Sequence, residues 1–322
     1  MDKISFVVIG KNQEKTIYNC IYSVYETIRV NNLTQYEVIF VDSDSTDQTL
    51  DIIKDNFPEV IIVKLKGRLN VAIAKNNGAA RATGNILFFI DGDITLDEKF
   101  IGCVLDENRN LKYQLVSGRL EEILYNNRWE EIGFVKDRFV KVSAGKGLME
   151  LGGIFLVKAE LFNSVSGFNE HMKLDEDADL QLRLASKGVL VERIPDRIGI
   201  HNTIYYFSYK RLFKKISKGD FLYIGALYRH NLGNRACLQK FAYMQKFTAL
   251  LIALTAASIL LSPFILLGYP TAILLKYLVT GNKKCSALEY FAGRLATDLC
   301  CILGFIIFYP GLKKVNYEVI AD

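Results

Sequence analysis

The chain has 322 residues, half of them hydrophobic, and a formal net charge of +5, which is the length of one long domain or of two. Its six cysteines form no C-x-x-C pair and no regular spacing, so we expect free thiols in a reducing compartment and no disulfide framework. The apolar residues are unevenly placed, because residues 1–200 have an ordinary soluble composition whereas residues 247–279 and 291–309 are largely apolar.

Strand and helix patterns alternate through the first part of the chain. Short apolar runs predict buried strands at 4–9, 36–41, 60–65 and 86–90. Helical spacing of apolar residues predicts helices between them, at about 14–30, 48–56 and 70–82. This alternation predicts right-handed βαβ units and therefore an α/β domain, in which helices flank a mostly parallel sheet.

The later patterns are less regular. They predict a helix near 97–108, strands and irregular connections over 114–142, a short helix within 158–168, a helix that ends at Gly188, and strands at 189–195 and 198–200. Thr46 or Asp47 can cap the helix at 48–56.

The run at 86–90 ends in Asp91-Gly92-Asp93, at the edge of a parallel sheet where ligands bind. A second acidic loop, 42–47, follows the strand at 36–41, so both loops are expected at the same edge. Paired carboxylate oxygens suit Mg²⁺ or Mn²⁺, and such a metal suits a diphosphate. An Asp-Gly turn without a ligand is the alternative reading of this motif.

Two common nucleotide-binding signatures are absent. The chain contains no G-x-x-x-x-G-K-[ST] motif, and no G-x-G-x-x-G motif follows its first strand. These absences argue against a P-loop NTPase and against a dinucleotide-dependent dehydrogenase. A bound diphosphate would then depend on a metal and on nearby Lys and Arg side chains.

Three further signals follow. Gly152-Gly153 precedes an apolar strand and indicates either close approach of a ligand to the backbone or a simple bulge. Four acidic residues lie close together at the start of the helix that ends at Gly188. A favourable interaction with the helix dipole explains one or two of them. The other role that we consider for one of these carboxylates is that of a general base. His201 is either a packed residue or a third metal ligand.

These pieces together resemble a family 2 glycosyltransferase with a GT-A fold. The resemblance rests on five motifs in order: ISFVVIGKNQEKTI, YEVIFVDSDSTDQT, AKNNGAARATGNILFFIDGD, LGGIFLVKAELFNSVSGFNE and DEDADLQLRLASKG. It covers about residues 3–205. It implies a nucleotide-sugar donor, a divalent metal (Mg²⁺ or Mn²⁺) and transfer to an acceptor hydroxyl with inversion at the anomeric carbon.

The resemblance also implies roles for the donor-side residues. Asp42 and Asp44 belong to the loop that holds the base and ribose. Lys75 and Asn76 match a basic-Asn pair near the nucleotide. Asp91 belongs to the D-x-D motif that faces the donor.

The remaining roles concern the metal and the acceptor. Asp93 is preferred over Asp91 as the direct metal ligand, and His201 matches a histidine that assists the metal or the diphosphate. Gly152 and Gly153 match the acceptor-side loop. Within the E-D motif Glu176-Asp177, Asp177 is the expected catalytic base.

Two departures from the family pattern matter. The family commonly has V-D-D-G-S after the second strand, whereas this chain has Val41-Asp42-Ser43-Asp44-Ser45, which leaves open which Asp contacts the base. The Q-x-x-R-W motif of processive synthases is missing, which favours addition of a single sugar.

Residues 206–246 are basic and rich in aromatic side chains, with Asp220 as their sole acid. Such a stretch fits nucleic acid or an anionic membrane surface. Its position before the apolar segments favours the membrane, so we expect no nucleic-acid partner.

The chain is therefore expected to have a catalytic domain (1–205), an interfacial segment (206–246) and membrane-associated helices (247–322, at about 247–279 and 291–309). Pro263 and Gly268-Tyr269-Pro270 interrupt the first apolar segment. Two full crossings would place Lys283 and Lys284 outside, against the positive-inside tendency; a kinked or re-entrant first segment would keep them in the cytoplasm. We expect the plasma membrane, with the catalytic domain cytoplasmic.

The predicted function is transfer of one sugar from a nucleotide sugar to a glycan hydroxyl, on an acceptor that is expected to be lipid-linked, in cell-surface polysaccharide synthesis. One alternative is a polyprenyl-phosphate glycosyltransferase, whose acceptor is a phosphate. Another is a non-catalytic membrane subunit that binds nucleotide.

Overall fold

The computed structural model describes residues 1–139, 145–148, 151–205, 209–280, 285–312 and 316–320. The chain forms two compact units. The sheet unit comprises residues 1–171, 176–205 and the C-terminal strand, and the helical unit comprises residues 172–175 together with the chain from 206 to 313.

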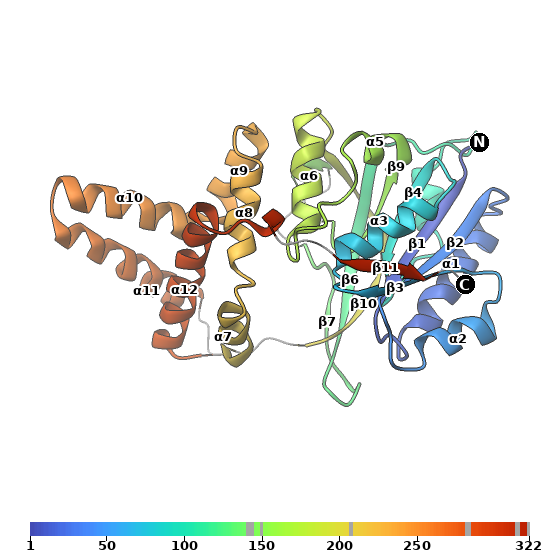
Figure 1. Ribbon diagram of the computed structural model, residues 1–322, viewed down its shortest axis with the longest axis horizontal. Helices are drawn as coiled ribbons and strands as arrows, with labels where there is room; N and C mark the ends of the chain where they lie inside the picture. The colour runs from blue at the N-terminus through green and yellow to red at the C-terminus, as the bar shows by residue number, and fades with distance from the viewer. Residues whose placement is uncertain (140–144, 149–150, 206–208, 281–284, 313–315, 321–322) are drawn as a thin grey trace. The chain divides into compact units, whose positions relative to one another are not determined.

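The sheet unit is built on one mixed β-sheet (Figure 1). Its strands follow in the spatial order β11 (Tyr317–Ile320), β3 (Ile61–Gly67), β2 (Tyr36–Asp42), β1 (Ile4–Gly10), β4 (Ile86–Asp91), β9 (Ile154–Lys158), β6 (Leu115–Tyr125), β10 (Val191–Ile204) and β5 (Ile94–Leu96). Two further strands pair at its side, β7 (Glu131–Val135) with β6 and β8 (Gly145–Gly147) with β10. Pairing is parallel among β3, β2, β1 and β4 and between β6 and β10, whereas β9 and β11 are antiparallel to their neighbours. The α/β fold is confirmed, with its parallel part in the first four strands.

Helices cover both faces of this sheet, as its alternating strand residues require. Phe6 and Val8 face a core that includes α1 (Ile17–Val30), α2 (Thr49–Asn56) and α4 (Phe100–Val104). Val7 and Ile9 face the opposite core, which includes α3 (Val71–Arg81), α5 (Ala159–Ser164) and α6 (Glu176–Ser186). Because both faces are covered, the strands are apolar throughout, which is why they read as continuous hydrophobic runs.

The strand register places the two acidic loops at the same edge, as predicted. Gly10 lies opposite Asp42 and Ile9 lies opposite Asp91 in the parallel pairs of β1 with β2 and β4. The carboxyl ends of three adjacent parallel strands therefore meet where ligands bind in open α/β sheets.

Some local expectations differ from the structure. The helix expected near 97–108 is short, because the chain turns after α4 and Leu105 bridges to Leu111. The expected cap of α2 is present in altered form: Gln48 occupies the cap position, but Asp47 Oδ1 accepts from the backbone N–H of Thr49 at 3.0 Å.

The two strands expected at 189–195 and 198–200 are one strand, β10, whose register against β6 shifts between Arg193 and Gly199. The C-terminal strand β11, which pairs with the edge strand β3, has no counterpart among the predictions.

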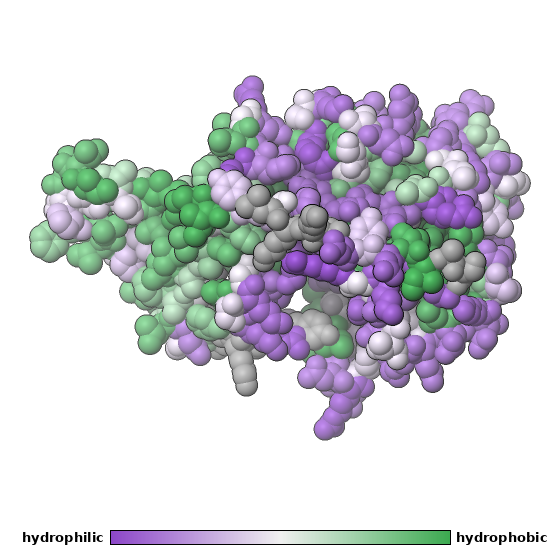
Figure 2. All heavy atoms as spheres, viewed as in Figure 1, coloured by the Kyte–Doolittle hydropathy of each residue, from purple (hydrophilic) through white to green (hydrophobic). Residues whose placement is uncertain are grey.

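The described residues of the helical unit are mostly helical. Its helices are α7 (Tyr209–Ser217), α8 (Leu222–His230), α9 (Arg235–Met244), α10 (Lys246–Leu260), the 3₁₀ helix η1 (Pro263–Leu267), α11 (Gly268–Thr280), α12 (Ala287–Ile306) and the 3₁₀ helix η2 (Pro310–Leu312). The first apolar segment breaks after Leu260, in agreement with the interruption predicted from Pro263. The surface of this first apolar segment is predominantly apolar, as the green spheres over α10 and α11 show (Figure 2).

Within the described residues, the stretch Pro263–Thr280 is long and apolar enough to cross a membrane. The bent pair of α9 and α10, with 91° between its helices, passes the same test if it is counted as one span. Helix α12, which overlaps the second expected segment, is not among these candidates and buries the charged residue Asp298.

Candidate active site

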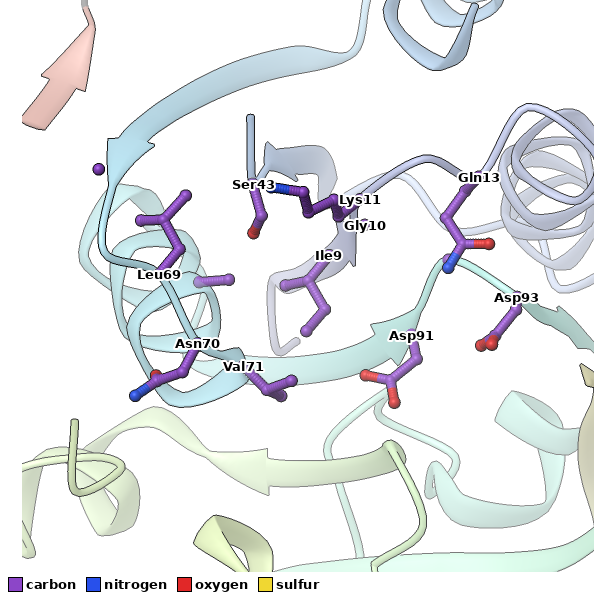
Figure 3. A pocket seen from close by; sticks show the side chains of 13 residues that line it. Ile9, Gly10, Lys11, Gln13, Ser43, Leu69, Asn70, Val71, Asp91 and Asp93 are labelled. Atoms are coloured by element: carbon purple, nitrogen blue, oxygen red, sulfur yellow. The ribbon is translucent and has the colours of Figure 1, made fainter. Parts of the chain in front are cut away.

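A cavity of about 390 Å³ opens at the carboxyl edge of the parallel strands (Figure 3). Ile9, Gly10, Lys11 and Gln13 line it from the end of β1, and Asp91, Gly92 and Asp93 line it from the end of β4. Ser43 and the connection from β3 to α3 complete the wall. The predicted D-x-D motif therefore borders a cavity of the size that small-molecule sites have.

Asn70 fixes the connection from β3 to α3 beside this cavity. Its Oδ1 accepts from the backbone N–H of Ile73 at 2.9 Å, which caps α3, and its Nδ2 donates to the carbonyl of Glu170 at 2.7 Å. The cap makes Asn70 a rigid part of the wall.

Asp91 is held by Gly153. The backbone N–H of Asp91 donates to the Gly153 carbonyl at 2.9 Å, and a Cβ on Gly153 would lie 2.0 Å from Asp91 Oδ2. Gly153 has φ +78°, which favours glycine. Gly153 thus makes room for the carboxylate, a structural role that its sequence position did not reveal.

The Asp91 carboxyl has one oxygen without a hydrogen bond from the described residues, although the Lys75 ammonium lies 3.9 Å from it. This oxygen, Oδ1, is buried. Burial raises the pKa of Asp91 to about 6, with a further rise from the charges of Asp93 and Asp177, although the Lys75 ammonium opposes this shift. A cation or a proton is therefore favoured beside this oxygen.

Lys75 is the buried cation that joins the two predicted acidic motifs. Its side chain is 1% exposed, and its Nζ lies 3.0 Å from Asp177 Oδ1, 3.8 Å from Glu176 Oε1 and 3.9 Å from Asp91 Oδ1. Burial lowers the pKa of Lys75, but the charges of Asp177, Asp91 and Glu176 outweigh that effect and raise it above its ordinary value. Lys75 lies outside the cavity lining and contacts the carboxylates instead.

The acidic cluster at the start of α6 divides into two roles. Glu176 and Asp177 face Lys75, and burial together with the Asp177 charge raises the pKa of Glu176 to about 7. Asp179 is fully buried and pairs with Arg183, at 2.7 Å between Oδ2 and Nε. The helix dipole alone therefore does not explain these acidic residues, because Asp179 forms a structural ion pair with Arg183.

His201 lies between two carboxylates. Its Nε2 is 3.3 Å from Asp93 Oδ2 and its Nδ1 is 3.0 Å from Glu122 Oε1. Burial lowers the pKa of His201, but its hydrogen bonds to Asp93 and Glu122 outweigh burial and raise the pKa to about 9. The structure thus brings His201 to Asp93, as expected for a residue that assists the metal, and adds Glu122 and its partner Arg138.

The other predicted donor-side residues lie outside the cavity lining. Asp42 is buried, its Oδ2 accepts from the backbone N–H of Ser45 at 3.0 Å, and its Oδ1 accepts no hydrogen bond from the described residues. Asp44 is exposed and has φ +65°. Asn76 bonds through its amide to the backbone of Phe168, at 2.8 and 2.9 Å.

Gly152 also has a positive φ, +67°, and a Cβ there would lie 2.7 Å from the Phe139 ring. It therefore supports the loop before β9 by close packing. The cavity does not include Gly152 or Gly153 in its lining.

The residues at the cavity fit a divalent metal of the kind that binds with a diphosphate. No group of three or more His, Cys, Asp and Glu side chains in the described part of the chain is arranged to hold a metal by itself. Mg²⁺ in phosphate-binding sites takes one or two carboxylates and obtains its other ligands from the phosphates and water. Asp91 and Asp93 match that donor set and line the cavity, and Oδ1 of Asp91 accepts no hydrogen bond from the described residues.

The sequence analysis missed several cavity residues. Lys11, Gln13, Ser43 and Asn70 line the cavity, but each belongs to a polar connection in which no residue stands out. The sequence offers one indication that these residues line a site, which is that they directly follow predicted strands or precede predicted helices.

Comparisons with known proteins agree with this architecture. Residues 5–151 match the profile of glycosyl transferase family 2, and residues 146–206 match a profile described as the N-terminal domain of galactosyltransferase. The glycosyltransferase SunS of Bacillus subtilis strain 168, encoded by the SPbeta prophage, is 33% identical over 106 residues. That match covers 33% of this chain and 24% of SunS, so the chain spans about a quarter of this relative's length.

Two solved structures share the fold. The mannosyltransferase PcManGT from Pyrobaculum calidifontis, in complex with GDP-Man and Mn²⁺, has a TM-score of 0.59 and 16% identity, over 95% of this chain and 87% of PcManGT. TarS of S. aureus has a TM-score of 0.53 and 14% identity, over 91% of this chain and 90% of the other. Residues 5–151 of this chain are therefore a glycosyl transferase family 2 domain, and its fold is that of the GT-A glycosyltransferases.

Proposed function

We propose that this protein is an inverting, metal-dependent glycosyltransferase, which moves a single sugar from a nucleotide sugar to a hydroxyl of a lipid-linked glycan in cell-surface polysaccharide synthesis. One observation carries the proposal: Lys75 contacts Asp91 of the D-x-D motif and Glu176-Asp177 of the E-D motif. The donor-side and acceptor-side acids therefore form one cluster beside the cavity.

The cavity is the donor half of this site. Ser43, next to the buried Asp42, lines the cavity, so we propose that the loop that contains both residues lies beside the nucleoside. Asp91 and Asp93 would hold Mg²⁺ or Mn²⁺, which neutralises charge on the departing diphosphate when it is bound. The likeness to PcManGT, whose structure contains GDP-Man and Mn²⁺, supports a nucleotide sugar and a divalent metal.

Asp177 is the proposed base for the acceptor hydroxyl. Its Oδ1 is held at 3.0 Å by Lys75, so its second oxygen is the one proposed to accept the acceptor proton. Lys75 fixes the rotamer of Asp177 and balances the charge that Asp91 and Glu176 bring to the same place. Holding donor and acceptor in line supplies much of the remaining rate enhancement.

The helical unit supports the membrane part of the proposal. It exposes large apolar side chains along α10 and α11, and α7 exposes Lys214 and Lys215, which would contact anionic headgroups. We place the protein at the plasma membrane with its catalytic domain (1–205, joined by β11) in the cytoplasm, followed by an interfacial segment (206–246) and membrane helices at about 247–279 and 291–309. A lipid-linked acceptor and the absence of a nucleic-acid partner follow from this placement.

The test is a panel of nucleotide sugars incubated with the detergent-solubilised chain, with Mn²⁺ or with EDTA. We expect Mn²⁺-dependent release of a nucleoside diphosphate from one donor, increased by a lipid extract that contains acceptor. Absence of turnover on every donor with that extract, together with absence of metal-dependent nucleotide binding, would contradict the proposal.

A further inference from the structure

The turn between α10 and α11 is the most exposed apolar part of the described chain. Ile259, Leu260, Leu261 and Phe264 are 80%, 81%, 78% and 79% exposed, respectively. Exposure of such a contiguous apolar surface to water is unfavourable, and in soluble proteins a surface of this kind marks a binding face. Figure 2 shows mostly green spheres over α10 and α11, with white and pale purple spheres between them.

The arms on either side of this turn carry no charge. The chain has no Asp, Glu, Lys or Arg between Lys246, where α10 begins, and Lys276, near the end of α11. A hairpin that crossed a membrane twice would place its turn in the water on the far side, where a polar loop is needed. The sequence of this turn, ILLSPFILL, is instead suited to hydrocarbon.

The arms are also short. Helix α10 has 15 residues and α11 has 13, and a rise of about 1.5 Å per residue gives each a length of roughly 20 Å. A helix that spans the hydrocarbon core needs about 20 residues. Helix α10 is therefore too short to carry the turn to the far side of the bilayer, although the returning stretch Pro263–Thr280, which adds η1 to α11, approaches the length of a span.

Both arms are tied to α12 through one buried carboxylate. Asp298 Oδ1 accepts from Thr248 Oγ1 of α10, and Oδ2 accepts from the hydroxyl of Tyr269 of α11, each at 2.6 Å. Arg294 donates to the same carboxylate at 2.9 Å. The polar side chains that join the hairpin to α12 therefore bond to one another. The hairpin can enter a membrane without exposing them to the hydrocarbon.

We infer that α10, η1 and α11 form a re-entrant hairpin, which enters and leaves a phospholipid bilayer through the same face, with Leu261 and Phe264 within the hydrocarbon core. This inference rests on the proposed membrane association and specifies how the hairpin lies in the bilayer. Lys246 and Lys276 then lie on the entry face, beside the exposed lysines of α7, where anionic headgroups are within reach.

Depth-dependent quenching of tryptophan fluorescence tests this inference. Because Trp129 is the sole tryptophan, Trp129→Phe gives a silent background for the full chain. Phe264→Trp and Leu261→Trp then report from the turn, and Met244→Trp, at the exposed end of α9, is the control. Each variant is reconstituted into phosphatidylcholine–phosphatidylglycerol vesicles that carry bromine either near the acyl-chain end or near the headgroup.

We expect bromine near the acyl-chain end to remove most of the emission from the two turn variants and little from the control. Strong quenching of both turn variants by headgroup-proximal bromine alone would place the turn in a headgroup region, outside the hydrocarbon core, and overturn the re-entrant hairpin. Failure of the chain to float with vesicles would instead reject the membrane association itself, and donor turnover in detergent would report separately on the enzyme.

Discussion

Gly153 and Asp91 occupy one space: a Cβ at Gly153 would lie 2.0 Å from the Asp91 carboxylate. This relationship explains why a glycine stands at position 153, beside the D-x-D motif. It also links the loop before β9 to the proposed metal site through the hydrogen bond from Asp91 N–H to the Gly153 carbonyl.

Gly153→Ala is therefore expected to displace the Asp91 carboxylate and to weaken Mn²⁺-dependent nucleotide binding about tenfold or more. Its positive φ also costs about 1–2 kcal/mol of folding free energy. Gly188→Ala is the matched control, because Gly188 has φ +81° with no atom within 4 Å of the added Cβ. Calorimetric titration should show normal binding by the control, and normal binding by Gly153→Ala would refute the steric account.

Glu122 is expected to act as a positioning residue for His201. Glu122→Gln removes the charge that faces Nδ1 and should weaken Mn²⁺ affinity roughly 10–100-fold. Glu121→Gln serves as the control, since its neighbour Glu121 instead pairs with Arg119 and Arg197. Equal Mn²⁺ affinities for the two variants, measured by titration in the presence of nucleotide, would show that Glu122 has no such role.

Asp177→Asn should lower turnover by roughly 10²–10⁴-fold, the range for loss of a general base. Donor affinity should change little, because Asp177 lies outside the cavity lining. The measurement is single-turnover transfer beside nucleotide titration. Wild-type turnover in this variant would make the base assignment wrong and would favour an acceptor, such as a phosphate, that needs no base.

Glu37 gives a prediction for stability that is independent of the active site. Burial alone raises its pKa, but hydrogen bonds from Ser5, Thr83 and Lys3 outweigh burial and lower the pKa from 4.5 to about 2. The ionised carboxylate therefore stabilises the fold above pH 4.5, and this contribution is lost as the pH falls from 4.5 toward 2.

Glu37→Gln should accordingly reduce the free energy of unfolding by about 2 kcal/mol at pH 7. The difference from the wild-type protein should shrink as the pH is lowered from 5 to 3, as measured by urea unfolding in mild detergent. A difference that stays constant over this range would mean that the charge of Glu37 does not contribute.

Sequence patterns predicted the elements that bury continuous apolar runs. Strands β1, β2 and β4 were found because each is apolar on both faces, and their shared edge followed from the parallel arrangement. Strand β11 was missed because its four residues are partly or fully exposed, so that its pairing with β3 depends on where the chain returns and not on a local pattern.

The residue types of the candidate site were predicted from the sequence, but the contacts between its side chains were not. Lys75 was expected near the nucleotide, whereas the structure buries it among three carboxylates. That arrangement depends on how α3 and α6 pack on the sheet, which no local spacing encodes. The same holds for Asp179, whose pairing with Arg183 separates it from the acids that face Lys75.

The most direct test of the central claim is calorimetric titration of Mn²⁺ with GDP, UDP, CDP and dTDP into the wild-type chain and into Asp93→Asn. The account predicts that one nucleotide binds the wild-type chain only when Mn²⁺ is present, and that Asp93→Asn binds the same mixture at least about tenfold more weakly. Equal metal-dependent affinity in the two proteins would contradict the placement of the donor and its metal at Asp91 and Asp93.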